Sequence, residues 1–181
     1  MFIVEVDEEI TLKMLNAADA EELFAITDRS REYLREWLPW LDYTKSVDDS
    51  LQFIKNNFQL YAERKGVTAG IFYNGSLAGV AGYNELDWVN KIAYIGYWLD
   101  IEHQGKGIMT RAVRALTDYA FEEFDLNRVD IRAAVGNVKS RAIPERLGYK
   151  KEGVLRQSEW LYDHFVDHAV YSMLKSEWNT S

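Results

Sequence analysis

Two spacings of apolar residues alternate along the chain, and they predict where helices and strands lie. A repeat of three to four residues predicts an amphipathic helix, and a repeat of two predicts a strand. The helical repeat is clearest over 46–61, and Ser46 and Asp49 at the start of this segment resemble a capping box. Its apolar positions are Val47, Leu51, Ile54, Phe58 and Tyr61.

Three further helices are expected. Asn16 should cap the first, whose buried face carries Ala20, Leu23, Phe24 and Thr27. A second, after a glycine-containing loop, should bury Met109, Ala112, Val113, Leu116 and Ala120. A short third helix is expected over 140–147, with Gly148 as its C-cap.

Strands are expected over 3–15 (interrupted near 7–9), 67–73, 77–86, 92–99, 128–135, 150–160 and 163–175. Asn74-Gly75 predicts a hairpin turn. A helix separates the segments 92–99 and 128–135, so these two strands should be parallel with a right-handed crossover. The sequence therefore predicts one mixed α/β domain over 1–181. Its sheet of six to seven strands should be mostly antiparallel, with one parallel crossover and about four flanking helices.

Composition narrows the classes of function. The chain has 181 residues, 48% of them hydrophobic, a net charge of −8 and no cysteine. No basic cluster indicates nucleic-acid binding, and no apolar run reaches the roughly 18–20 residues of a membrane span. The acidic N-terminus is unlike a signal peptide, so we expect a cytoplasmic protein. The sequence does not determine the oligomeric state, and a homo-oligomer is one of the alternatives.

The most informative stretch is Tyr94–Ala115, which reads as a strand, a loop with Gly105 and Gly107, and a helix start. Free N–H groups and the helix dipole make such a helix start an anion site. The P-loop pattern fails here because no Ser or Thr follows Gly107 directly. The dinucleotide fingerprint fails because Thr110 replaces its third glycine.

The pattern Gln104-x-x-Gly107-x-Met109 resembles the acyl-CoA turn of the GCN5-related N-acetyltransferase (GNAT) superfamily, with Met109 in place of Gly or Ala. A larger residue there is similar to the RimJ/RimL-type branch, which acetylates ribosomal-protein N-termini. The segments LREWLPWLD (34–42), Asn137-x-x-Ser140 and ERLGY (145–149) also resemble that branch. The resemblance covers essentially the whole chain. It implies the GNAT fold and acetyl-CoA as co-substrate, with no metal.

The resemblance further implies that the pantetheine arm enters between the two parallel strands, with the pyrophosphate on the backbone of 104–110. Lys106 and Arg111 either add charge there or are merely solvated, and Asn137 either binds pantetheine or only forms a turn. The implied donor-binding residues are Leu99, Gln104, Gly105, Lys106, Gly107, Ile108, Met109, Thr110 and Asn137.

The catalytic residues are harder to assign. Without cysteine, and with no histidine spacing that suggests a base for a serine nucleophile, direct attack by the amine in a ternary complex is the simpler hypothesis. The tyrosine that serves many relatives as general acid is replaced by Pro144. The resemblance points instead to Ser140, which could equally cap its helix. It also points to Glu159 as the base, the alternative being a surface carboxylate.

The acceptor amine stays open. An α-amine with a pKa of about 7.8 is roughly 14% neutral at pH 7, whereas lysine is about 0.04% neutral, so a weak base suits an α-amine better. Trp37, Trp40 and Tyr43 either shape an acceptor groove or pack a short loop. The leading hypothesis is transfer to a protein N-terminal amine, and the resemblance implies that of a ribosomal protein. The alternatives are a small amine (a polyamine, amino acid or antibiotic) and a non-catalytic acyl-CoA-binding module.

Overall fold

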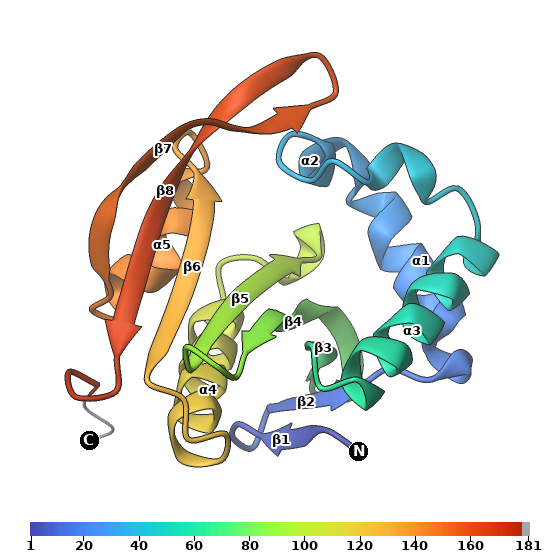
Figure 1. Ribbon diagram of the computed structural model, residues 1–181. Coiled ribbons are helices and arrows are strands. Elements are labelled where there is room, and N and C mark those ends of the chain that lie inside the picture. The colour runs from blue at the N-terminus through green and yellow to red at the C-terminus, as the bar shows by residue number, and fades with distance from the viewer. Residues whose placement is uncertain (179–181) are drawn as a thin grey trace.

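The computed structural model describes residues 1–178, which fold around one eight-stranded sheet of order β1-β2-β3-β4-β5-β6-β8-β7 (Figure 1). Only β5 and β6 pair in parallel; the other neighbouring pairs are antiparallel. The strands are β1 (Ile3–Glu5), β2 (Ile10–Met14), β3 (Val67–Tyr73), β4 (Ser76–Asp87), β5 (Ile92–Leu99), β6 (Arg128–Ala134), β7 (Lys150–Leu161) and β8 (His164–Leu174).

Five α-helices and three short 3₁₀ turns complete the described chain. The α-helices are α1 (Ala20–Arg29), α2 (Arg31–Arg35), α3 (Val47–Ala62), α4 (Ile108–Glu122) and α5 (Val138–Arg146). The 3₁₀ turns are η1 (Ala17–Asp19), η2 (Leu41–Tyr43) and η3 (Ile101–His103). None of the described helices is long and apolar enough to cross a membrane.

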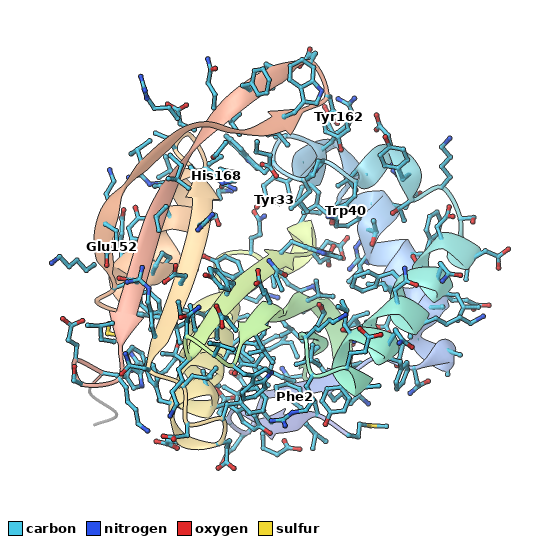
Figure 2. The ribbon with its side chains drawn as sticks, viewed as in Figure 1. Phe2, Tyr33, Trp40, Glu152, Tyr162 and His168 are labelled. Atoms are coloured by element: carbon cyan, nitrogen blue, oxygen red, sulfur yellow. The ribbon has the colours of Figure 1, made fainter. Side chains whose placement is uncertain are left out.

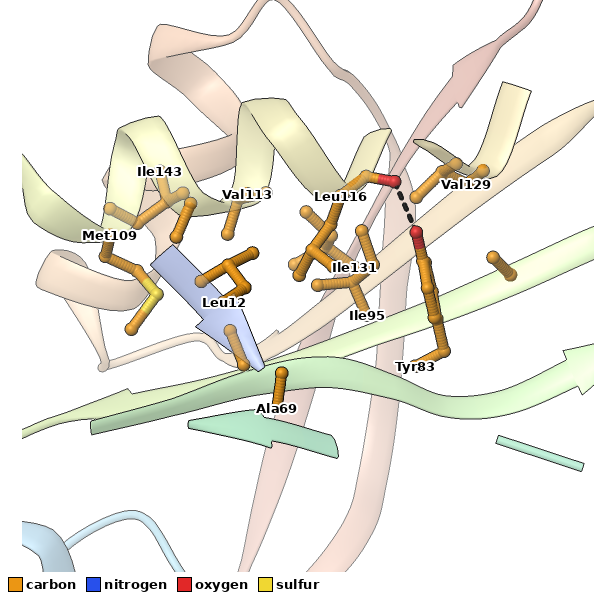
Figure 3. Packing of buried hydrophobic residues seen from close by; sticks show 14 of the residues in the cluster. Leu12, Ala69, Tyr83, Ile95, Met109, Val113, Leu116, Val129, Ile131 and Ile143 are labelled. Carbon is orange, nitrogen blue, oxygen red and sulfur yellow. Dashed lines mark hydrogen bonds between the residues drawn. The ribbon is translucent and has the colours of Figure 1, made fainter. Parts of the chain in front are cut away.

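The helices lie on opposite faces of the sheet, α1–α3 on one side and α4 and α5 on the other (Figure 1). Two separate apolar clusters result, because alternate residues of a strand point to opposite faces. Ile71 packs in the larger cluster with α4, whereas its neighbour Phe72 packs with α1 and α3. Figure 3 shows the larger cluster, in which the buried Tyr83 hydroxyl donates to the Leu116 carbonyl at 2.6 Å.

The predicted architecture is confirmed, including the Asn74-Gly75 hairpin and the parallel crossover. The interruption near 7–9 separates two short strands, so the sheet has eight strands rather than six or seven. The predicted stripe of α4 is buried throughout. The short helix begins at Val138, two residues earlier than predicted, and Gly148 follows it with φ +81°.

Two predicted helix faces are slightly wrong. In α1 the buried face includes Ile26, while Phe24 is only partly buried. In α3 Asn57 is buried and Phe58 is 40% exposed. The Asn57 amide accepts from the N–H of Thr68 at 2.7 Å and donates to its carbonyl at 2.8 Å. This polar pairing with β3 turns α3 away from the face that hydrophobicity alone indicates.

The parallel strands separate at their carboxyl ends. Pairing between β5 and β6 runs from Ile92 and Arg128 to Ile95 and Ile131, and it stops there. From Gly96 to Leu99, β5 pairs with β4 alone. The gap that opens lies at the carboxyl edge of the crossover unit, where such folds bind ligands.

Candidate active site

The glycine loop forms one end of a cavity of about 470 Å³. Gly107 is the N-cap of α4, and both Gly105 (φ +78°) and Gly107 (φ +71°) have left-handed backbones. A Cβ atom added to either residue would meet no protein atom within 4 Å, so the space above them is open. The first N–H groups of α4 have no acceptor within the helix. This surface suits a phosphate-bearing ligand, as the acetyl-CoA hypothesis requires.

All but one of the predicted donor residues line this cavity. They are Leu99, Gln104, Gly105, Gly107, Ile108, Met109, Thr110 and Asn137. Lys106 does not; its ammonium lies 5.5 Å from the centre of the Tyr73 ring. Arg111 is bound by Asp7 and Glu9 at 2.9 and 2.8 Å. The positive charges that the cavity presents are therefore the positive end of α4 and the side chains of Lys139 and Arg146, which also line it, rather than Lys106 and Arg111.

A fully buried carboxylate anchors the segment that leads into this loop. Asp100 follows β5 directly, and it accepts hydrogen bonds from Arg29 (Nε, 2.9 Å), Ser30 (Oγ, 2.8 Å) and His103 (Nδ1, 2.7 Å). Burial opposes ionisation, but these hydrogen bonds outweigh it and lower the pKa of Asp100 to about 2. Asp100 thus ties the α1–α2 junction to the glycine loop. Sequence analysis did not identify this residue.

Ser140 lies in the first turn of α5, and a partner on β5 holds its backbone. Asn137, rather than Ser140, is the N-cap: its Oδ1 accepts from the Ser140 N–H at 3.3 Å. Pro144 lies inside α5, where it cannot donate to the carbonyl four residues earlier, that of Ser140. The Tyr97 hydroxyl donates to that carbonyl instead, at 2.8 Å. Burial raises the pKa of Tyr97, so its hydroxyl keeps the proton that it donates.

A second cavity, of about 560 Å³, lies on the α1–α3 side of the sheet. Trp37, Trp40 and Trp98 contribute indole rings to its lining, whereas Tyr43 is 78% exposed and takes no part. Trp40 and His168, which both line this cavity, lie on either side of the space between α2 and β8 (Figure 2). Six residues line both cavities: Trp37, Leu38, Tyr97, Trp98, Asn137 and Ser140. The two spaces therefore adjoin at these residues, Ser140 among them.

Four acidic or basic side chains line this second cavity: Asp49, Arg132, Glu159 and His168. The Asp49 carboxylate is occupied by the backbone N–H groups of Lys45 and Ser46, at 2.8 and 3.1 Å. Glu159, the predicted base, lies within hydrogen-bonding distance of His168: its Oε1 is 3.2 Å from Nε2. Sequence analysis found no role for His168, because β8 meets Glu159 only through the folded hairpin.

The β7–β8 hairpin also reaches over to α2 (Figure 1). At its tip, the Tyr162 hydroxyl donates to the Leu38 carbonyl at 2.5 Å and accepts from the Leu41 N–H at 3.2 Å. The Arg35 guanidinium lies 3.8 Å from the centre of the Tyr162 ring. These contacts fasten the strand of Glu159 to the segment that carries Leu38, Trp37 and Trp40. The wall of the second cavity is thus built from two distant parts of the chain.

Comparison with known proteins identifies the family of this chain. The profile of the Acetyltransferase (GNAT) domain matches residues 9–150. The chain is 44% identical over 179 residues to YdaF of Bacillus subtilis, which is named as a candidate ribosomal N-acetyltransferase, and the match covers 98% of both proteins.

Two solved structures are similar in fold. The microcin C7 self-immunity acetyltransferase MccE, in complex with acetyl-CoA and AMP, has a TM-score of 0.91 and 32% identity, covering 94% of this chain and 95% of MccE. RimL, a ribosomal L7/L12 α-N-protein acetyltransferase in complex with coenzyme A, has a TM-score of 0.92 and 28% identity, covering 96% and 98%. The chain therefore belongs to the GNAT acetyltransferase family, in its RimJ/RimL-type branch, and is an N-acetyltransferase whose acyl donor is acetyl-CoA.

Proposed function

We propose that the acceptor is the N-terminal α-amine of a protein, which attacks acetyl-CoA directly in a ternary complex. The observation that carries this proposal is the second cavity, which meets the donor cavity at Ser140 and offers one carboxylate not committed to backbone N–H groups, Glu159. A polyamine would call for several free carboxylates. The indole walls suit the apolar and amide groups of a peptide. The names of YdaF and RimL also support this choice.

The reaction needs two proton movements. The neutral amine attacks the thioester carbonyl, so that a C–N bond forms and the C–S bond breaks. Glu159 takes the proton that the amine loses, and the Ser140 hydroxyl supplies a proton to the departing thiolate. Solvent then returns a proton to Ser140 and accepts the proton held by Glu159, so both groups are restored. The pantetheine arm lies in the gap beside Leu99 and Asn137, with the pyrophosphate over the loop of 104–110.

The central test is thiol release from acetyl-CoA in the presence of a panel of acceptors. The panel contains N-terminal peptides, the same peptides with a blocked α-amine but a free lysine, and polyamines. We expect turnover only with a free α-amine, and mass spectrometry should place the acetyl group there. Faster turnover with polyamines would contradict the acceptor class. Thermal stabilisation by acetyl-CoA without any turnover would indicate a non-catalytic module.

Ser140→Ala tests the general acid. We expect turnover to fall at least tenfold with a modest loss of stability, because Asn137 still caps α5. Ser76→Ala, at the exposed start of β4, is the matched control and should leave turnover unchanged. Near wild-type turnover of Ser140→Ala would refute its role.

Glu159→Gln tests the base. Because a base matters most when the acceptor amine is mainly protonated, the variant should slow transfer most below about pH 7.5. A pH–rate profile of unchanged shape would show that Glu159 does not take the proton.

A second candidate acceptor is an amine carried by a nucleotide. MccE was solved with AMP, and the second cavity of this chain combines three indoles with Arg132, groups that suit a base and a phosphate. Competition by AMP against the peptide would favour this acceptor. An unchanged KM for the peptide at millimolar AMP would exclude it.

A further inference from the structure

A bulge in β7 directs Glu159 toward the acceptor cavity. Leu155 lies opposite His168 and Glu159 lies opposite Val166, so four steps along β7 match only two along β8. In a regular ladder Gln157 would occupy the position of Glu159. Gln157 instead has a left-handed backbone (φ +48°), and its N–H donates to Asp167 Oδ1 at 2.7 Å. Such bulges re-aim a side chain, often beside an active site.

The bulge changes the surroundings of Glu159 sharply. From Lys150 to Trp160, every residue of β7 is exposed except Glu159, whose side chain is 27% exposed. Its hydrogen-bonding neighbour His168, on β8, has a side chain that is 18% exposed. An ionised carboxylate can only accept hydrogen bonds, so Nε2 of His168 must carry the proton in the 3.2 Å contact with Oε1. Within residues 1–178, this is the one side-chain hydrogen bond to Glu159.

We propose that His168 is a positioning residue for acetyl transfer: its Nε2–H fixes the Glu159 carboxylate so that Oε2 is presented to the acceptor amine. The inference rests on the proposed role of Glu159 as base. A glutamate on an edge strand otherwise samples several rotamers, and only some of them face the cavity. Holding one of them prepares the base before the acceptor arrives.

The experiment compares His168→Ala, His168→Gln, Glu159→Gln and the double variant Glu159→Gln/His168→Ala. For each, kcat and the KM values for peptide and acetyl-CoA are measured. The glutamine amide can donate from nearly the same place as Nε2, but it cannot take up a proton. His164→Ala is the matched control, since His164 is an exposed residue of the same strand that is paired with Asp163.

We expect His168→Ala to lower kcat about tenfold, with an unchanged KM for acetyl-CoA. This is less than the 10²–10⁴-fold that a general base contributes. His168→Gln should recover most of the lost turnover, and His164→Ala should stay within twofold of wild type. In the Glu159→Gln background, His168→Ala should cost less than twofold, because the carboxylate that it positions is already absent.

The outcomes separate this inference from the proposed function. Full turnover of His168→Ala beside a slow Glu159→Gln overturns the role of His168 and leaves Glu159 as base. An unimpaired Glu159→Gln overturns both. Equal losses in His168→Ala and His168→Gln, or an undiminished loss in the double variant, would show that His168 acts other than by holding Glu159. Thermal midpoints identify any variant that loses turnover by unfolding, and His168→Gln then decides, as the closer match in shape.

Discussion

Tyr97→Phe tests how Ser140 is held in place. The substitution removes one hydroxyl, which donates to the Ser140 carbonyl at 2.8 Å, and leaves the ring. Because Pro144 has no N–H, α5 cannot replace that hydrogen bond. An unsatisfied carbonyl in a part-buried site costs about 1–3 kcal/mol. At roughly 2–4 °C per kcal/mol for a chain of this size, Tm should fall by several degrees.

The same variant should impair catalysis more than binding of the donor. The freed carbonyl belongs to Ser140 itself, so the first turn of α5 loses its attachment to β5. We expect kcat to fall about tenfold, equivalent to about 1.4 kcal/mol. The KM for acetyl-CoA should change little, because the glycine loop is untouched and the ring of residue 97, which lines the donor cavity, is kept. Tyr94→Phe is the control: among the described residues, the Tyr94 hydroxyl has no hydrogen-bond partner.

A double-mutant cycle with Pro144→Ala makes the reasoning refutable. Alanine at 144 restores an N–H that bonds to the Ser140 carbonyl within the helix. In that background, Tyr97→Phe should cost less than about 0.5 kcal/mol, whereas it costs about 1–3 kcal/mol in the wild type. Urea unfolding measures both costs. Equal costs in the two backgrounds would refute the claim that Tyr97 replaces the bond that Pro144 lacks.

Two further predictions concern the donor side. Asp100 has a pKa of about 2 against an ordinary 3.8, so its ionised form contributes roughly 2–3 kcal/mol above pH 4, and this is lost as the pH falls toward 2. Asp100→Asn should therefore lower the urea midpoint at pH 7 and make the midpoint less dependent on acid pH. The control is Asp42→Asn, because Asp42 forms a similar but exposed pair with Arg35; this variant should change neither the midpoint nor its pH dependence. Gly107→Ala should raise the KM for acetyl-CoA at least tenfold, because its Cβ would enter the open space of the donor cavity. Gly75→Ala, at a left-handed hairpin position, has a similar backbone cost and should leave that KM unchanged.

The predictions that held were those that depend on local sequence. Strand and helix periods, the Asn74-Gly75 turn and the parallel crossover follow from residues close together in the chain, and the structure confirms them. The faces of α1 and α3 were slightly wrong because hydrophobicity ignores polar pairing, such as that of Asn57 with Thr68. The residues around Gly107 that were predicted to bind the donor line one cavity, because a loop and the helix after it form one local unit.

The missed residues share a different property, since each acts through a partner far away in the sequence. Asp100 binds Arg29, and Tyr97 holds Ser140. His168 reaches Glu159 only because the bulge in β7 adds two residues to one strand of the hairpin. The spacing of hydrophobic residues does not predict such contacts between distant parts of the chain. Two chemical signals were present in the sequence: Asp100 directly after the strand β5, and Pro144 where a helix needs an N–H donor.

These contacts converge on the end of β5 for a physical reason. Beyond Ile95 this strand has lost its pairing with β6, so the backbone from Gly96 to Leu99 is held by the sheet on one side only. The open side is the gap in which we propose that the pantetheine arm lies, and continued pairing with β6 would close it. Tyr97 and Asp100 stabilise this half-paired segment from its two ends, through the Ser140 carbonyl and through Arg29. The glycine loop, the α1–α2 junction and Ser140, the proposed acid, are thereby attached to one stretch of four consecutive residues, Tyr97–Asp100.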